Sequence, residues 1–147
     1  MKNFDPKEHV GLLLKFINGR VVNKINKNLS KFNLTRVQHE ILCFIDRNEH
    51  ERDVFQKDIE KCLKLTNPTV TGIVKRLEEK EMIARCPSST DARYKCLHVT
   101  EKGKDVICKS FKFGANNIEK QLSKGMTDEE VKMFKDLLYR ALKNMEE

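Results

Sequence analysis

Two short amphipathic segments, separated only by Lys64-Leu65-Thr66, constrain the fold of this chain more than any other feature. The first segment is predicted to be a helix over residues 53–63, and the second begins at Thr66. Thr66 is a favourable N-cap residue, and Pro68 falls in the first turn, where its missing N–H costs nothing. A short helix, a tight turn and a second capped helix predict a helix-turn-helix.

The residues that follow predict a β-hairpin. Residues 82–86 and 94–99 are the expected strands, and the loop between them is rich in turn residues. If Ile83 pairs with Val99, then Ile83, Leu97 and Val99 share the inner face of the hairpin. A two-stranded hairpin is marginal alone, so this one must pack on the helices as a wing.

The rest of the chain is predicted to be helical, because Pro and Gly are sparse and apolar residues recur every three or four positions. The first expected helix covers residues 7–29. The second is opened by a capping box formed by Thr35 and Gln38, and it ends between Arg47 and Glu51. A third is expected from Thr100 to about Leu122, and a last helix is opened by a second capping box at Thr127. The predicted fold class is mainly α with a small β-hairpin wing, an α+β winged helix-turn-helix.

Two apolar stripes favour a homodimer with a helical dimerisation lobe. The stripe of residues 7–29 is wider than one neighbouring helix needs, and the last helix stays apolar where chain ends usually fray. We therefore expect residues 1–147 to form a single module. Within it, residues 7–29 and 104–146 would form the dimerisation lobe, and residues 53–100 the winged lobe. The other reading of the first helix is a buried helix of a monomer.

The positive charge of the chain is concentrated. The formal net charge is +7 and the pI is about 9.2. Residues 61–104 hold ten Lys/Arg and five Asp/Glu, which is most of the excess in under a third of the chain. A local excess of this kind indicates contact with phosphate groups.

Composition and motifs exclude several classes of protein. No stretch approaches the roughly eighteen apolar residues of a membrane span. No secretory signal is evident, and the five cysteines include no C-x-x-C pair, so we expect a cytoplasmic protein with mostly free thiols. There is no phosphate-binding glycine loop and no nucleophile motif, so no enzyme and no cofactor are predicted. Two Asp–His pairs have the four-residue spacing of helical neighbours: Asp5 with His9, and Asp46 with His50. Solvated surface pairs account for this spacing, so no metal site is predicted.

The helix that starts after Thr66 presents a polar face once its apolar residues point inward. Asn and Arg can pair bidentately with adenine and guanine, and Thr can contact thymine or phosphate. The expected DNA-contacting residues are Thr66, Asn67, Pro68, Thr69, Thr71, Lys75, Arg76, Arg85, Asp91, Arg93 and Lys95. For the helix the alternative is an ordinary solvated face, and for Arg85 and Lys95 it is plain surface charge.

Arg93 and the cysteines each leave alternatives open. Arg93 could enter a narrow minor groove, or Asp91 could hold it to shape the loop. Cys86 and Cys96 would lie opposite each other on the outer face of the hairpin, where a disulfide would report oxidation. The other reading is two free thiols. Cys43, Cys62 and Cys108 are expected to be small core residues.

The order of these parts resembles the MarR (multiple antibiotic resistance regulator) family of winged helix-turn-helix transcriptional regulators. The motifs that carry the resemblance are Leu34-Thr35-x-x-Gln38, Thr66-x-Pro68-x-Val70-Thr71-x-x-Val74-x-x-Leu77-Glu78, Asp91-x-Arg93 and Leu97-x-Val99-Thr100-x-x-Gly103. One departure is Glu81, where the family often has Gly, so the helix before it is expected to end differently and to loosen the wing.

The resemblance implies a homodimer whose two recognition helices bind successive major grooves of double-stranded DNA at a pseudo-palindromic operator, with the wings on the minor groove. It also implies a repressor that responds to a small anionic aromatic effector, with no membrane role. The alternatives are a sensor gated by thiols or a metal ion, and a winged-helix protein-assembly module that does not bind DNA.

Overall fold

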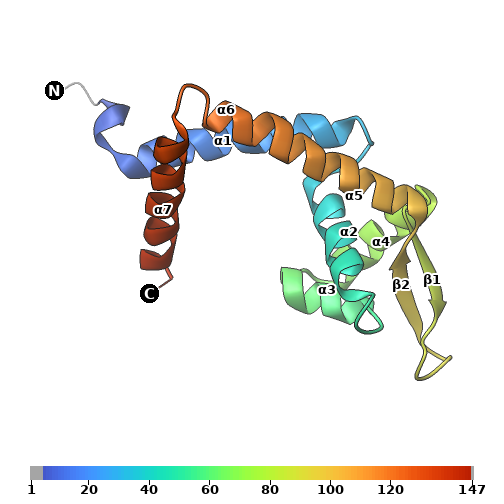
Figure 1. Cartoon of the computed structure of the whole chain (residues 1–147). Coiled ribbons are helices and arrows are strands. Elements are labelled where there is room, and N and C mark those ends of the chain that lie inside the picture. Colours follow the sequence, from blue (N-terminus) through green and yellow to red (C-terminus); the bar gives the residue numbers. More distant parts are fainter. Residues whose placement is uncertain (1–4, 147) are drawn as a thin grey trace. The chain divides into compact units, whose positions relative to one another are not determined.

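The structure is a computed structural model that describes residues 5–146. It contains two compact units, Met1–Lys112 and Phe113–Glu147. The elements along the chain (Figure 1) are η1 (Pro6–Glu8), α1 (Val10–Ser30), α2 (Arg36–Asn48), α3 (Gln56–Leu63), α4 (Asn67–Glu79), β1 (Ile83–Pro87), β2 (Lys95–Val99), α5 (Glu101–Phe113), the π-helix η2 (Gly114–Glu119), α6 (Lys120–Leu122) and α7 (Asp128–Asn144).

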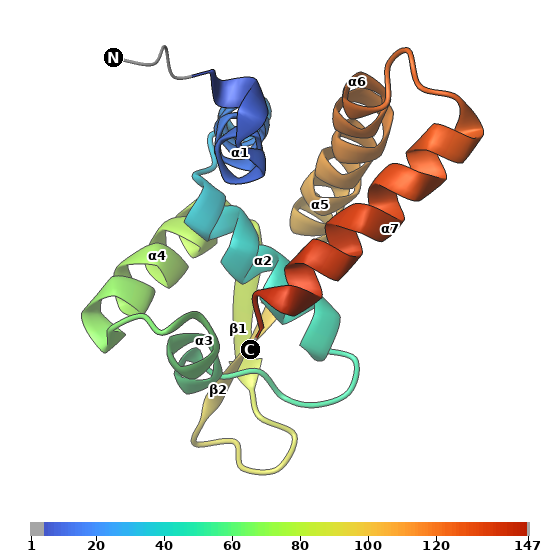
Figure 2. The same ribbon diagram turned by 90° about the vertical axis from the view of Figure 1, so that its left-hand side faces the viewer.

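The helix-turn-helix is formed by α3 and α4, and it lies beside the β1–β2 hairpin (Figure 2). The prediction that the first helix begins at Asp53 is wrong, because α3 begins at Gln56. The residues before it are extended, since the Val54 carbonyl accepts a hydrogen bond from Leu97 N at 2.8 Å. The Asp58 carboxylate then accepts from Phe55 N at 2.8 Å and caps the helix that follows.

The inner face of α4 is the apolar face that the sequence predicted. Val70, Val74 and Leu77 have no exposed surface. Thr66 occupies the N-cap position as expected, but its hydroxyl pairs with the Thr69 hydroxyl at 2.8 Å and does not cap a backbone N–H. The helix therefore begins where the sequence places it, with a different hydrogen bond.

The end of α4 does not differ as the Glu81 departure suggested. Glu81 adopts the left-handed conformation with φ of 59°, the conformation that a glycine would take. Met82 N donates to the Leu77 carbonyl at 3.0 Å, and the Thr100 hydroxyl donates to the Glu81 carbonyl at 2.6 Å. The exit into the wing is thus fixed by hydrogen bonds despite the bulkier residue.

The hairpin has the predicted register. Ile83 pairs with Val99, and Cys86 with Cys96. Ile83, Leu97 and Val99 are buried, which confirms the predicted inner face. The far end of the hairpin is tied to the segment before α3, because the Asp53 carboxylate accepts from the Ser88 hydroxyl at 2.7 Å and from Ser89 N at 2.8 Å.

The core of the Met1–Lys112 unit is centred on α2. Ile41, Leu42 and Ile45 have no exposed surface, and the predicted Thr35/Gln38 capping box opens the helix. At the other end of α2, the Glu49 carboxylate accepts from Val99 N at 2.8 Å, so the helix is joined to the wing. These contacts fix the wing relative to the helix-turn-helix.

The Phe113–Glu147 unit is helical. The predicted helix from Thr100 to Leu122 is present as three segments, because a π-helix interrupts it after Phe113. The predicted capping box at Thr127 opens α7. The fold class is confirmed as mainly helical with one two-stranded antiparallel wing. Over residues 5–146, no helix combines the length and hydropathy that crossing a membrane requires.

Candidate nucleic-acid interface

The outer face of α4 is polar and exposed. All the residues that the sequence assigned to it are exposed: Thr66, Asn67, Pro68, Thr69, Thr71, Lys75 and Arg76. In the ion pairs formed within residues 5–146, neither Lys75 nor Arg76 takes part. Their charges are therefore not neutralised by carboxylates of the described chain, and they face solvent.

The first turn of α4 is held by α3. Asn67 Nδ2 donates to Glu60 Oε1 at 2.7 Å, and Gln56 Nε2 donates to the Thr71 hydroxyl at 3.0 Å. These bonds connect the two helices of the helix-turn-helix at their exposed edge. The polar side chains at the start of α4 are thereby held on a fixed element.

Arg85 lies between the wing and both helices. Its Nε donates to Glu78 Oε1 of α4 at 3.0 Å, and its Nη2 donates to Gln56 Oε1 of α3 at 3.0 Å. This geometry gives Arg85 a structural role, while its contact with DNA stays a prediction. Lys95, at the start of β2, is exposed.

The tip of the wing carries an arginine held in place by its neighbour. Arg93 Nε donates to both carboxylate oxygens of Asp91, at 3.0 and 3.1 Å, and its Nη2 donates to Oδ2 at 2.7 Å. The Arg93 side chain is nevertheless 86% exposed. The hydrogen bonds from Arg93 hold the pKa of Asp91 below its usual value, so the carboxylate stays ionised. Both jobs considered for Arg93 are compatible with this position.

A groove separates the helix-turn-helix from the wing loop. Its volume is about 570 Å³, and it is lined by residues from the start of α3, by Asn67 of α4, and by Thr90, Tyr94 and Lys95 of the wing. The groove thus lies between α3 and the wing loop, and Asn67 is the residue of α4 that reaches it.

The cysteine predictions need two corrections. Cys86 and Cys96 do lie opposite each other, but Cys96 is not on an outer face: it is 1% exposed, because the segment around Val54 packs along β2. Cys62 and Cys108 are exposed rather than in the core, whereas Cys43 is buried as predicted.

Within residues 5–146, two clusters of side chains have donor atoms close enough to bind one ion. They are Cys86, Cys96 and His98 in the wing, and Asp46, Glu49 and His50 at the end of α2. Sequence reasoning considered only pairs four residues apart on helices, so it missed the wing cluster, whose members are joined by strand pairing.

Sequence reasoning also missed the residues that support the interface. Asp53, Gln56 and Glu49 join the wing to the helices, but each is an ordinary polar residue in an unremarkable sequence context. The only signal available was the run of polar residues between α2 and α3. Their roles depend on contacts with residues about 30 to 50 positions later in the chain.

Comparisons with known proteins agree with this geometry. A family model described as the MarR family matches residues 32–93. The uncharacterised HTH-type transcriptional regulator YybA of Bacillus subtilis (strain 168) is 31% identical over 121 residues, which cover 82% of this chain and 78% of YybA.

Two solved structures of MepR from S. aureus are also similar. A single-residue mutant of MepR is 25% identical with a TM-score of 0.84, over 93% of this chain and 98% of that one. The MepR–DNA complex is 26% identical with a TM-score of 0.76, over 92% and 98% of the two chains. The fold and the interface together define a winged helix-turn-helix transcriptional regulator. The chain belongs to the MarR family.

Proposed function

We propose that this protein is a homodimeric repressor that binds a pseudo-palindromic double-stranded DNA operator through α4 and the wing. In this proposal α4 enters the major groove and Arg93 enters the adjacent minor groove. The contacting residues are those predicted from the sequence, with Arg85 acting mainly as a support. We also propose a cytoplasmic location, because the proposed ligand is double-stranded DNA.

The observation that carries the proposal is the unpaired charge on the outer face of α4. Lys75 and Arg76 are exposed and take part in no ion pair within the described chain, next to a wing whose tip carries an exposed arginine. Arg is well suited to bidentate contact with guanine, and Lys to phosphate. The similarity to MepR, which has been solved in complex with DNA, supports the same use of this surface.

Dimerisation is proposed from apolar surface that each unit leaves exposed. In α1, Val10 is 70% and Phe16 is 51% exposed, and in α7, Met133 is 63% and Leu142 is 58% exposed. No residue of α7 is buried, although its apolar side chains recur at helical spacing. Such surface normally marks an interaction site, and a second copy of the chain fits an operator with two half-sites.

An effector site is proposed at a cavity in the Met1–Lys112 unit. The cavity has a volume of about 620 Å³, and its walls include Arg36, Arg47, Phe44, Phe111 and His39. Burial, together with the nearby Arg47 charge, lowers the pKa of His39, so this ring is neutral near pH 7. The lining holds two guanidinium groups against one carboxylate, that of Glu40, and with its two aromatic rings it suits a small anionic aromatic molecule.

The direct test of the proposal is selection of bound sequences from a pool of randomised DNA duplexes. The proposal expects an enriched inverted repeat with half-sites one helical turn apart, about 34–36 Å. Enrichment should be lost with Arg76→Ala. If the wild type and the variant both retain DNA but enrich no particular sequence, the proposal is contradicted. That result would favour a winged-helix module for protein assembly.

A further inference from the structure

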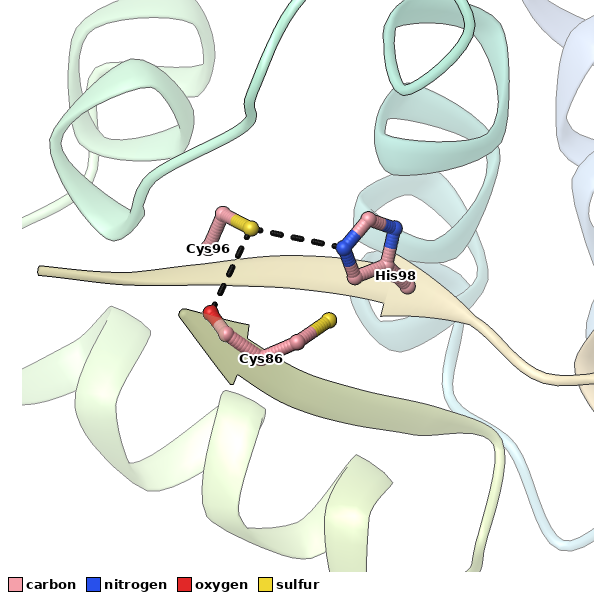
Figure 3. A group of neighbouring side chains, drawn as sticks. All are labelled: Cys86, Cys96 and His98. Atoms are coloured by element: carbon pink, nitrogen blue, oxygen red, sulfur yellow. Dashed lines mark hydrogen bonds between the residues drawn. The ribbon is translucent and has the colours of Figure 1, made fainter. Parts of the chain in front are cut away.

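The wing contains a cluster of side chains that DNA recognition does not use. Cys86 lies near the end of β1, and Cys96 and His98 lie two residues apart on β2 (Figure 3). The two sulfur atoms and a ring nitrogen of His98 are all within 4.8 Å of one another. We propose that Cys86, Cys96 and His98 form a binding site for Zn²⁺.

Strand pairing is what assembles the three donors. Cys86 is directly opposite Cys96, and Ala84 is opposite His98, so the three side chains project from the same face of the hairpin. This face is opposite to that of Ile83, Leu97 and Val99, which serve the core. The cluster is therefore a consequence of the hairpin register and not of chance approach by flexible side chains.

The geometry between Cys96 and His98 suits a single ion. Cys96 Sγ lies 3.3 Å from His98 Nε2, as the dashed line in Figure 3 shows. An ion about 2.3 Å from the sulfur and about 2.0 Å from the nitrogen would see the two donors at an angle of about 100°, which is near the tetrahedral value. Cys86 is half-buried, and rotation of its side chain would bring the second sulfur within range.

The donor set is one that Zn²⁺ uses. Two thiolates and one imidazole leave a fourth position for water, and the two thiolates neutralise the charge of the ion. Softer thiolate donors disfavour Mg²⁺ and Ca²⁺, which require oxygen ligands. Cys96 Sγ donates to the Cys86 carbonyl at 3.4 Å, so binding of the ion as a dithiolate would release this proton and the thiol proton of Cys86.

The surroundings of the cluster favour a cation. Glu49 Oε2 lies 3.8 Å from His98 Nδ1, on the ring atom that would not bind the ion, and the Glu49 side chain is only 6% exposed. At this distance the two atoms are not hydrogen-bonded, but a small rotation of the ring would let Nδ1 donate to the carboxylate, the arrangement that orients a metal-binding histidine. Lys104 partly offsets the charge of Glu49, at 3.3 Å from Oε1.

Bound Zn²⁺ would join the two strands next to the loop that carries Asp91 and Arg93. It would thereby limit the positions available to the wing, and Zn²⁺ would change the affinity for the operator. This consequence rests on the proposed DNA-binding function, whereas the metal site itself does not. The test is accordingly designed around binding of the ion.

The test is titration of the reduced full-length protein with Co²⁺, which has visible and thiolate charge-transfer absorption where Zn²⁺ has none. We expect one Co²⁺ per chain, a charge-transfer band typical of two thiolates, and displacement of Co²⁺ by Zn²⁺. Cys86→Ser should halve the band, and His98→Gln should weaken Zn²⁺ binding at least about tenfold in competition with a chromophoric chelator. Because Cys96 is buried, it is left intact, and circular dichroism checks that each variant folds.

Exposed cysteines outside the cluster provide matched controls. Cys62→Ser and Cys108→Ser should leave the Co²⁺ spectrum unchanged. Zn²⁺ should also raise the thermal unfolding midpoint of the wild type and of both controls, and it should raise that of Cys86→Ser less, because this variant keeps only two of the three donors. A spectrum that is insensitive to Cys86→Ser and His98→Gln, or no binding at micromolar Co²⁺, would overturn the proposal whether or not the protein binds DNA.

Discussion

Arg93 and Asp91 form a three-bond ion pair at the tip of the wing, yet Arg93 remains 86% exposed. Solvent screens such a pair, so its contribution to folding is small. Its effect is to fix the direction of the guanidinium in a loop without regular secondary structure. The pair therefore orients the guanidinium more than it stabilises the fold.

Substitution of Arg93 by Ala should weaken operator binding about tenfold and leave the thermal midpoint unchanged, because an exposed pair adds little to folding. Asp91→Ala should weaken binding by a smaller factor, since the arginine remains but loses its orientation. Fluorescence anisotropy measures both. The matched control is Arg52→Ala, which breaks another exposed Arg–Asp pair, with Asp58 at 3.0 Å, outside the predicted interface. Tighter binding by Asp91→Ala would show that the carboxylate only neutralises Arg93.

Glu81→Gly should stabilise the protein by about 0.5–1 kcal/mol. Glu81 has a positive φ, and this left-handed conformation costs a non-glycine residue about 1–2 kcal/mol. Glycine removes that cost, but it also raises the conformational entropy of the unfolded chain, which cancels part of the gain. Urea denaturation measures the change. The same substitution at exposed Glu40, inside α2, should destabilise by about 0.5–1 kcal/mol. Equal effects at the two positions would refute the conformational explanation.

Gly103→Ala should destabilise the protein by about 1–3 kcal/mol. A Cβ at this position would collide with the Met82 carbonyl oxygen and would lie 2.7 Å from Val99 Cγ1, and the backbone carbonyl cannot move without disturbing the exit from α4. The control is Gly72→Ala, which meets no atom within 4 Å and should stabilise α4 by about 0.5–1 kcal/mol. Denaturant midpoints distinguish the two, and a neutral Gly103→Ala would contradict the packing described here.

The attachment of the wing by Asp53 should depend on pH. Hydrogen bonds from Ser88 and Ser89 lower the pKa of Asp53 in the folded state. A carboxyl group whose pKa is lowered by folding stabilises the protein at pH values above its pKa in the unfolded chain, about 3.9. This stabilisation is lost as the pH falls through the pKa of the group in the folded protein. Asp53→Asn should therefore be less stable than the wild type at pH 7, and the difference should shrink in strong acid. A difference that is constant from pH 7 to pH 2 would contradict this assignment.

Local patterns were sufficient to predict most of the secondary structure. Both capping boxes, at Thr35 and Thr127, open the helices that they predicted, because a capping box acts within four residues. The pairing of Ile83 with Val99 followed from the alternation of apolar residues, which allows only one register when one face is buried.

The errors lie where contacts distant in the sequence determine the outcome. Asp53 and Val54 are extended because they bind the wing, and no local pattern reveals hydrogen bonds to Ser88 or Leu97. For the same reason Cys96 is buried rather than exposed. The polar face of α4 was predictable, because it is what remains once the apolar face has been assigned. The cluster of Cys86, Cys96 and His98 could be recognised only after the pairing of β1 with β2 was known.

The most direct test of the central claim is the salt dependence of operator binding, measured by fluorescence anisotropy for the wild type, Arg76→Ala and Lys124→Ala. Both variants lose one positive charge, but only Arg76 lies on the outer face of α4. We predict that Arg76→Ala loses about fivefold to 150-fold in affinity, the range of about 1–3 kcal/mol for a base contact, and that Lys124→Ala matches the wild type in affinity and in salt slope. Equal affinities for all three proteins would contradict the assignment of α4 as the DNA-reading helix.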